Sequence, residues 1–505
     1  MKRIVGVCGL LAGLVAGAHG QMPAGAAGST MAAGKGLGAL APLRVDSAVK
    51  AALRGISAQQ VQADIAKLVS FGTRSTVSSM DTDLPKGQGI LPAADWITSE
   101  FEAISKECGG CLEVKRDEFV QPASTDARSR ITQPTKLVNV YAILHGTGGE
   151  KAPWVLVTGH YDSRATNVMD GKLTSPGAND DASGVAVSLE SARAMARLTK
   201  AGVKLTGTMV FVAVAGEEQG LYGSAHLAKL AKAEGWPLEA VLNNDIVGGD
   251  TTPGETGQDK DVVRVFSESI PATATPEEQR MTLGLGAEND SPSRQLARHI
   301  VELAPVYFKP TTEQPPALKG GARSQLMRLV PAFHPVMILR RDRYLRGGDH
   351  TSFNAEGFAA VRFTEWRENF DHQHQTLRTE NGVEYGDLLK FVDFAYVVKV
   401  AQLNALTLAS LASAPSTPQQ VRVVTKELDN SSNLEWDASA FAPPGTTYEV
   451  VWRDTNENLW THSQSAGAET HLKLDVSKDN VLFGVRAVSA AGDRSLAVPP
   501  VPERK

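Results

Sequence analysis

The pattern of hydrophobic and polar positions predicts alternating strands and helices through the middle of the chain. Continuous apolar runs at residues 137–144, 154–157 and 208–215 are typical of buried strands. Hydrophobic residues recur at helical spacing over 58–69 and 93–107. This alternation predicts an α/β domain.

Residues 250–346 follow this alternation less well, because they are rich in Thr, Pro, Gly and charged residues. We expect this stretch to carry connections and a lid over the functional site. Strand character resumes at 359–364, and 385–411 shows one long helical pattern that would close the domain. The first domain is therefore expected to span 46–412.

Beyond residue 418 the pattern changes to strict alternation between turn-forming clusters, which predicts a small all-β, immunoglobulin-like sandwich over 419–500. Pro415 and Pro418 mark a linker at 413–418. We expect this linker to be exposed, so that a chain ending near 412 folds by itself. The alternating apolar residues are Val421, Val423, Leu434, Trp436, Tyr448, Val450, Trp452, Phe483, Val485 and Ala487.

The first twenty residues have the pattern of a secretory signal peptide. Lys2 and Arg3 precede an apolar run at 4–15, and Ala18-His19-Gly20 fits a cleavage site. That run is too short to span a bilayer, and we expect no later stretch to form a transmembrane helix. The protein is therefore expected to be secreted or periplasmic, with residues 21–45, rich in Gly and Ala, as a flexible lead-in.

Length, charge and cysteine content narrow the class of protein further. A chain of 505 residues allows two or three domains. Loss of Lys2 and Arg3 with the signal takes the formal net charge from −5 to −7, which argues against a general nucleic-acid binder. Cys108 and Cys111 then remain, and in an exported protein they predict a local disulfide. A redox site would need a surrounding βαβ pattern, and a zinc knuckle would need a second pair of ligands. Neither is evident in the sequence around the two cysteines.

Several predicted strands end in side chains that bind metals. His160 and Asp162 follow the strand at 154–157, and residues two apart in an extended segment share a face. His160 could then bind a metal while Asp162 orients its imidazole. A polar turn after a strand is the alternative interpretation.

Two acidic pairs follow in the same region. Asp180 and Asp181 lie in a Gly-rich loop that opens a helix, where carboxylates are favoured, so that simple capping is the alternative. Glu217 and Glu218 stand just past the strand at 208–215. Adjacent residues at a strand end point in opposite directions, so that one could bind a metal while the other handles a proton. Two exposed acids in a turn are the alternative.

The remaining candidates are one acid and three late histidines. Asp245 ends another apolar segment, and by itself it fits an ordinary turn. His350, His372 and His374 each occur more often as structural histidines than as ligands. Open α/β sheets, however, place their sites at the carboxyl ends of strands, where the earlier candidates stand.

Taken in order, these motifs resemble the secreted bacterial dizinc aminopeptidase family, whose relatives include glutamate carboxypeptidases and glutaminyl cyclases. The resemblance covers residues 57–411. It implies the zinc exopeptidase fold, a mixed central sheet flanked by helices. The motifs that carry it are Gly-His-Tyr-Asp at 159–162, Pro-Gly-Ala-Asn-Asp-Asp-Ala-Ser-Gly at 176–184, Gly-Glu-Glu-Gln-Gly-Leu-Tyr-Gly-Ser at 216–224, Asp245, and Asp349-His350.

The resemblance also implies an activity, that of a metallo-aminopeptidase which removes residues from the N-termini of peptides or proteins. Two Zn²⁺ ions would be its cofactors, and two imidazoles with three carboxylates suit this metal. By the resemblance, Glu217 is the general base and Asp162 the acid that orients a ligand. The implied zinc ligands are His160 and Asp245 for one ion, Glu218 and His374 for the other, and Asp180 between them.

The last ligand is chosen by its position relative to a later threonine. In the family the ligand is followed by Asp-Thr or Glu-Thr, and Thr379 stands at the matching place after His374. Arg378 replaces the acid, which leaves His372 as the second candidate. His350 matches a motif that the family places near the site but not among the ligands.

The C-terminal part resembles a fibronectin type III domain. Leu434-Glu-Trp436, the segment 448–452 and the segment 483–489 carry this likeness, with Phe483 where such domains usually have Tyr. Two other functions stay open. One is a glutaminyl-cyclase-like transferase with a single working zinc, and the other is a non-catalytic binding protein in which the sandwich does the binding. The side-chain preference and the oligomeric state stay undetermined.

Overall fold

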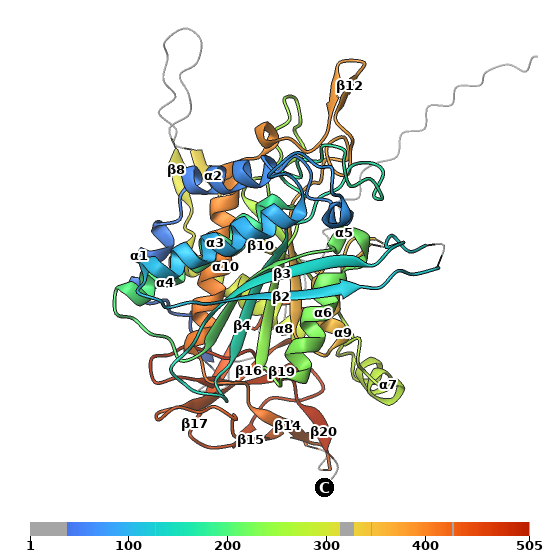
Figure 1. Cartoon of the computed structure of the whole chain (residues 1–505). Helices are drawn as coiled ribbons and strands as arrows, with labels where there is room; N and C mark the ends of the chain where they lie inside the picture. The colour runs from blue at the N-terminus through green and yellow to red at the C-terminus, as the bar shows by residue number, and fades with distance from the viewer. Residues whose placement is uncertain (1–37, 127, 314–327, 345, 427–428, 504–505) are drawn as a thin grey trace, which may run out of the picture. The chain divides into compact units, whose positions relative to one another are not determined.

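The computed structural model describes residues 38–126, 128–313, 328–344, 346–426 and 429–503 (Figure 1). The predicted signal peptide and most of the predicted lead-in lie outside these residues.

The centre of the protein is an eight-stranded mixed sheet with the strand order β10-β7-β11-β6-β4-β5-β3-β2. The pairs β5–β4, β4–β6, β6–β11 and β7–β10 are parallel, and the pairs β2–β3, β3–β5 and β7–β11 are antiparallel. The strands are β2 (Glu113–Gln121), β3 (Thr135–Leu144), β4 (Trp154–His160), β5 (Thr208–Val214), β6 (Leu238–Asn244), β7 (Val262–Ser267), β10 (His334–Ile338) and β11 (Ala360–Glu365).

The central strands are rich in apolar residues because both faces of the sheet are covered. In β5, Met209, Phe211 and Ala213 pack into one hydrophobic cluster, whereas Val210 and Val212 pack into another on the opposite face. This period of two follows from the strand geometry. Because both faces are buried, such a strand reads as a continuous apolar run, and these runs located the strands well.

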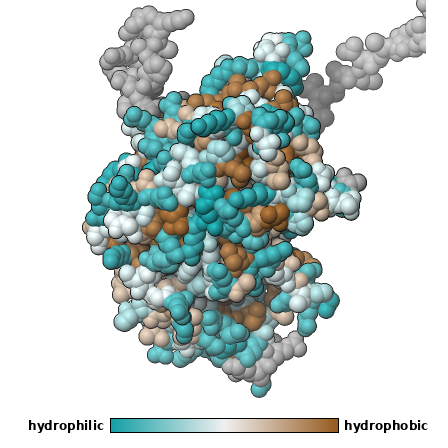
Figure 2. All heavy atoms as spheres, viewed as in Figure 1, coloured by the Kyte–Doolittle hydropathy of each residue, from teal (hydrophilic) through white to brown (hydrophobic). Residues whose placement is uncertain are grey.

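Helices cover both faces of the sheet, which confirms the predicted mixed sheet flanked by helices. On the face of the larger cluster lie α1 (Ser47–Arg54), α2 (Ala58–Val69), α3 (Ile90–Glu107), α4 (Ala182–Lys200), α8 (Pro292–Tyr307) and α10 (Phe394–Ser413). On the opposite face lie α6 (Tyr222–Ala233) and α9 (His350–Ala355). Hydrophilic and hydrophobic residues are interspersed on the surface shown in Figure 2.

Short elements complete the first domain. The helix α7 (Pro276–Leu285) has no buried residue. The others are η1 (Thr76–Met80), α5 (Glu217–Gly220), η2 (Leu389–Phe391), β8 (Thr311–Glu313), β9 (Arg328–Val330), β12 (Arg378–Glu380) and β13 (Val383–Tyr385).

Two expectations about the middle of the chain are wrong. The stretch 250–346 is more regular than expected, because it supplies β7, β10 and α8 to the sheet and its cover. The predicted helix at 385–411 begins only at Phe394, where the carboxylate of Asp393 caps it by accepting N–H groups from Ala395 and Tyr396. Residues 383–385 form the strand β13 instead.

The helix α10 is long and apolar enough to cross a membrane by length and composition alone, contrary to the expectation from sequence. Within its most apolar window, 67% of the residues are buried inside the protein. Val400, Leu403 and Leu406 belong to the main hydrophobic cluster, where α10 packs against α4. Its apolar composition is therefore accounted for by its central position in the core.

The C-terminal residues, together with the short strand β1 (Gly38–Ala39), form two four-stranded sheets, β18-β15-β14-β20 and β1-β17-β16-β19. Trp436 of the first sheet contacts Tyr448 of the second, with ring centroids 5.8 Å apart, so that the sheets pack as a sandwich. Gly38–Ala39, within the expected lead-in, form β1 and pair with β17. The other strands are β14 (Gln419–Val424), β15 (Ser432–Asp437), β16 (Thr447–Asp454), β17 (His462–Gly467), β18 (His471–Leu474), β19 (Val481–Val488) and β20 (Val501–Glu503).

The segment that leads into the sandwich is buried, so the prediction of an exposed linker is wrong. Ala414 is 1% exposed and Ser416 is 6% exposed. Ser416 donates its N–H to the carbonyl oxygen of Phe441, and Thr417 donates its N–H to Glu239, 3.1 Å away. The segment thus bonds to both parts that it connects.

The predicted disulfide between Cys108 and Cys111 is confirmed. Gly109 and Gly110 between them have φ angles of 81° and 85°, in the left-handed region that favours glycine. The two glycines therefore allow the tight turn after α3 in which the cysteines meet.

Candidate metal centre

The candidate ligands gather where three neighbouring parallel strands end. His160 is the last residue of β4, Glu217 and Glu218 follow β5, and Asp245 follows β6. Since β4 pairs in parallel with both β5 and β6, these ends lie at one edge of the sheet. Residues that follow different strands in the sequence are therefore brought close together at this edge.

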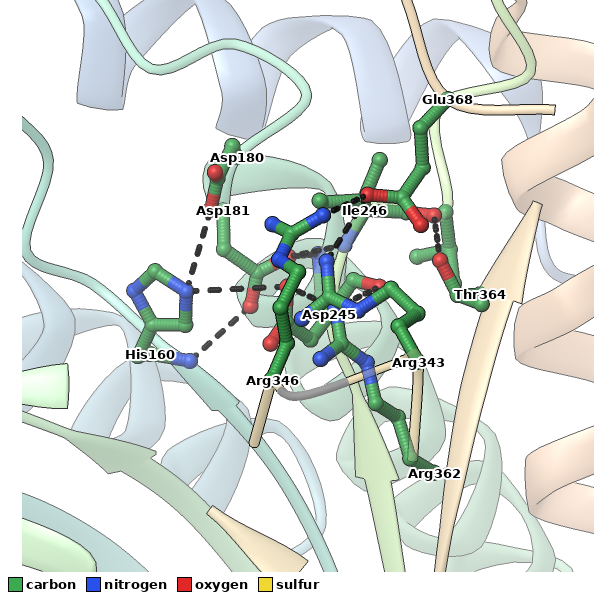
Figure 3. Close-up of polar contacts among 12 residues, drawn as sticks. His160, Asp180, Asp181, Asp245, Ile246, Arg343, Arg346, Arg362, Thr364 and Glu368 are labelled. Carbon is green, nitrogen blue, oxygen red and sulfur yellow. Dashed lines mark hydrogen bonds and ion pairs between the residues drawn. The ribbon is translucent and has the colours of Figure 1, made fainter. Parts of the chain in front are cut away.

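The imidazole of His160 has one nitrogen held and one directed at carboxylates. Its Nδ1 lies 3.1 Å from the carbonyl oxygen of Asp162 and 3.5 Å from the carboxylate of that residue. Its Nε2 lies 3.2 Å from Asp180 and 3.9 Å from Asp245 (Figure 3). Contact with Asp162 leaves Nε2 in position to bind a cation.

The adjacent acids Asp180 and Asp181 have different surroundings. Asp180 directs one carboxylate oxygen to His160 and the other to Nε2 of His374, 3.0 Å away. Asp181 accepts N–H groups from His160, Gly184 and Ile246, so that it caps α4 and joins three backbone segments. The capping interpretation therefore fits Asp181, and the ligand interpretation fits Asp180.

Glu217 and Glu218 lie in the first turn of α5 and not on an extended strand end, so the reason given for their divergence is wrong. Their N–H groups donate to the two carboxylate oxygens of Asp162, at 3.2 and 3.1 Å. Glu218 lies 3.1 Å from Nε2 of His374. Glu217 lies instead with His160 and Asp245.

Of the two late histidines, the structure brings His374 and not His372 to the carboxylates. His372 stacks on Phe391 and lies 3.3 Å from Asp250. His374 has a φ angle of 59°, which is uncommon for a residue with a Cβ and is found often at functional sites. His350 directs Nε2 to the carbonyl oxygen of Arg341 and is separate from this cluster.

The side chains form two groups, and within each group the ligand atoms all lie within 4.8 Å of one another. His160 Nε2 and Glu218 Oε1 are among the buried atoms of the described residues that form no well-aligned hydrogen bond, although Asp180 and His374 lie 3.2 and 3.1 Å from them. Buried polar atoms normally have partners, and imidazole nitrogens with carboxylate oxygens are the usual zinc ligands. The residues therefore fit zinc. The groups are His160, Glu217 and Asp245, and Asp180, Glu218 and His374.

The pKa values in the cluster show how strongly it favours positive charge. Burial raises the pKa of Glu217 well above its usual range, and neighbouring carboxylates raise it further. Burial lowers the pKa of His374, but the carboxylates of Glu218 and Asp180 outweigh it and raise that pKa to about 10. Buried carboxylates are costly unless a cation or proton balances them.

Three supporting residues escaped the sequence analysis. Arg362 is buried and forms an ion pair with Asp245 at 2.8 Å. Asp387 accepts N–H groups from Asn179 and Asp180, and Gln373 donates to Asp180 at 3.2 Å. A charged residue inside the apolar strand at 359–364 was the signal for Arg362. Asp387 and Gln373 carried no comparable signal.

The cluster opens into a pocket of about 930 Å³. Asp180, Glu217, Glu218, Asp245 and His374 line it. These ligand side chains can therefore be reached from solvent.

A buried set of imidazole and carboxylate ligands at the carboxyl edge of a mixed sheet, open to a pocket, defines a metallohydrolase-type centre. Residues 139–289 match the profile of peptidase family M28. A probable zinc metalloprotease of Leptosphaeria maculans is 41% identical over 468 residues, which are 92% of this chain and 100% of the relative. Another of Pyricularia oryzae is 42% identical and covers 90% of this chain and 85% of the relative. The chain thus belongs to peptidase family M28 and is a zinc metalloprotease.

These relatives are fungal, whereas the resemblance in the sequence named a bacterial family. Solved structures that are similar to this chain include the aminopeptidase LapA of Legionella pneumophila. It is 19% identical, with a TM-score of 0.45, and the match covers 74% of this chain and 75% of that chain. The zinc aminopeptidase BSAP of Bacillus subtilis is 14% identical, with a TM-score of 0.43, and the match covers 70% of this chain and 94% of that chain.

The contacts of Asp162 predict the effect of the variant Asp162→Asn. Its carboxylate lies beside His160 and accepts N–H groups from Glu217 and Glu218. We expect zinc affinity or activity to fall by about 10- to 100-fold, as for other partners of metal ligands. Zinc affinity measured by competition with a chelator checks this. Equal losses in Asp162→Asn and His160→Ala would contradict the supporting role.

Proposed function

We propose that this zinc metalloprotease is an exported aminopeptidase that uses two Zn²⁺ ions to remove N-terminal residues from peptides or proteins. The observation that carries the proposal is the position of Asp180. One of its oxygens faces His160 and the other faces His374, so that a single carboxylate joins the two ligand groups.

In this proposal each residue of the cluster has one role. His160 and Asp245 would hold one ion, Glu218 and His374 would hold the other, and Asp180 would serve as a ligand to both. When bound there, zinc would supply polarisation of a peptide carbonyl and a water whose pKa is lowered to about 7. Asp162 orients His160 and holds the turn that carries both glutamates.

Glu217 is proposed as the general base. It lines the pocket, and burial raises its pKa well above its usual range. A carboxylate in this position can accept a proton from water and then donate it to the leaving amine. Glu217 would thus serve first as base and then as acid in cleavage of the peptide bond.

Export and the domain assignment belong to the same proposal. The disulfide Cys108–Cys111 supports an oxidising compartment, secreted or periplasmic, because disulfides persist there. We propose a peptidase domain at 46–412 and a fibronectin type III-like sandwich at 419–500, with 413–418 between them. The packed pair of four-stranded sheets supports the second assignment.

The proposal predicts the metal content of the protein. Purified protein is expected to contain close to two zinc ions per chain, because both ligand groups fit zinc. Elemental analysis measures the content, and aminoacyl reporter substrates measure activity before and after chelation. Chelation should abolish activity, and zinc should restore it.

Other results would favour the alternatives. Full activity with one tightly held ion would contradict the two-zinc site. Cyclisation of a peptide with N-terminal Gln, without hydrolysis, would indicate a glutaminyl-cyclase-like transferase. Failure of the zinc-loaded protein to act on any peptide would indicate a binding protein.

A further inference from the structure

The pocket over the metal centre has positively charged walls. Its acidic lining residues, Asp180, Glu217, Glu218 and Asp245, all belong to the two ligand groups. The basic lining residues are Arg128, Arg130, Arg164, Arg343 and Arg346. Once two divalent cations balance the four acids, the arginines determine the electrostatic potential in the pocket.

The positive charge of this wall exceeds what nearby carboxylates balance. Arg343 and Arg346 both contact one oxygen of Glu368, at 2.8 and 2.9 Å. Arg264 contacts its other oxygen at 3.2 Å. Asp342 is shared in the same way between Arg343 and Arg362. Four guanidinium groups thus share Glu368 and Asp342, and of these four Arg362 also contacts Asp245, at 2.8 Å. Figure 3 draws Arg343, Arg346 and Arg362 together with Glu368 and Asp245.

Two other lining residues, Arg130 and Arg164, bond mainly to neutral groups. Arg130 donates to the carbonyl oxygen of Glu218 at 2.6 Å. Arg164 donates to the carbonyl oxygens of Ala165 and Thr166, and its carboxylate contact among the described residues is Glu218 at 4.0 Å. Bonds to carbonyl oxygens orient a guanidinium without neutralising it.

We propose that this pocket selects substrates with a carboxylate besides the bond that is cleaved, and that Arg343 and Arg346 bind it. Arginine suits this role, because its planar guanidinium pairs with carboxylates in a fixed geometry. Arg346 also lies over the ring of Phe370, 5.9 Å from its centroid, and Phe370 lines the pocket. The inference rests on the proposed aminopeptidase function and names its substrate class.

The carboxylate has two possible sources, an acidic side chain or the free carboxyl end of a dipeptide. Three matched pairs separate them: Asp-Ala-amide and Asn-Ala-amide, Ala-Asp-amide and Ala-Asn-amide, and Ala-Ala and Ala-Ala-amide. We expect kcat/KM to favour the acidic member of at least one pair by roughly 10- to 100-fold, the effect of one charge-assisted bond. The pair that shows the preference identifies the source.

A binding measurement tests the inference without catalysis. Glutarate and its monoamide have the same size, and both offer one carboxylate to bound zinc, but only glutarate has a second. Calorimetry on zinc-loaded protein is expected to show glutarate binding at least about tenfold more tightly. Arg346→Gln should remove most of this difference, because Arg346 is the more exposed of the pair, at 32% against 9%.

Arg367→Gln is the matched control, because Arg367 pairs with Glu255 on the surface and does not line this pocket. It should keep both the peptide preference and the glutarate difference. Equal rates on all three peptide pairs, with equal binding of glutarate and monoamide, would overturn the inference and leave the aminopeptidase function in place. Tighter glutarate binding without cleavage of any peptide would support the carboxylate site and overturn the aminopeptidase function.

Discussion

Replacing Glu217 with Gln is expected to lower turnover by roughly 10²–10⁴-fold, the usual contribution of general acid–base catalysis. The substitution keeps the size of the side chain and the N–H that donates to Asp162, but it removes the group that accepts a proton. Zinc content should stay close to that of the unchanged protein. Rates under saturating zinc, together with elemental analysis, measure both quantities.

Glu218→Gln is the matched control for this experiment. Glu218 lies 3.1 Å from His374 and is 3% exposed, so that the substitution weakens a ligand and should lower zinc occupancy first. Because Glu217 also lies in a ligand group, the two roles could be the reverse of those proposed. Loss of zinc in Glu217→Gln, with zinc retained in an inactive Glu218→Gln, would show that. Full activity in both variants would place the site elsewhere.

Hydrophobic periodicity located the central elements because each has a simple burial pattern. The strand β5 is buried on both faces, and α2 begins at Ala58 as predicted, after Ser57 caps it by accepting the N–H of Gln60. The start of α10 was missed, because apolar residues at 388–392 extend the helical pattern while the chain forms a short 3-10 turn before the cap at Asp393.

The sequence predicted the residues of the candidate site best where they stand at the ends of neighbouring parallel strands. His160 ends β4, whereas Glu218 and Asp245 follow β5 and β6 of the same parallel set, so their convergence follows from the topology. His372 and His374 lie two residues apart in one loop, and the sequence separated them only by the spacing to Thr379 that the family resemblance suggests. His372 lies away from the cluster because it stacks on Phe391, a contact that only the folded chain makes.

The pocket arginines Arg343 and Arg346 and the buried segment at 413–418 also depend on contacts that the sequence does not reveal. Arg343 and Arg346 come from the region that the sequence left least defined, and Glu368, which they share, lies beyond β11. The alternating residues correctly predicted a sandwich, but periodicity carries no information on its outer contacts. Those contacts change the expectation that a chain ending near 412 folds alone.

Arg486→Met in the sandwich is expected to destabilise the whole protein by about 3–5 kcal/mol, the typical result of breaking a buried ion pair. The side chain of Arg486 is 2% exposed and contacts Glu302 of α8 at 3.1 Å. It also contacts Glu449, and Arg453 contacts Asp290 at 2.6 Å across the same boundary. Loss of Arg486 leaves Glu302 buried without its partner. Urea unfolding of the full chain measures the change in free energy.

Lys473→Met is the control, because Lys473 is 60% exposed and its contact with Asp429 is 3.5 Å long. An exposed pair of this kind contributes about 0–1 kcal/mol. A loss below 1 kcal/mol in Arg486→Met would show that the two parts are energetically independent, as the sequence suggested. The expected loss instead makes the sandwich part of the folded peptidase, since a chain ending at 412 would leave both Glu302 and Asp290 without their arginine partners from the sandwich.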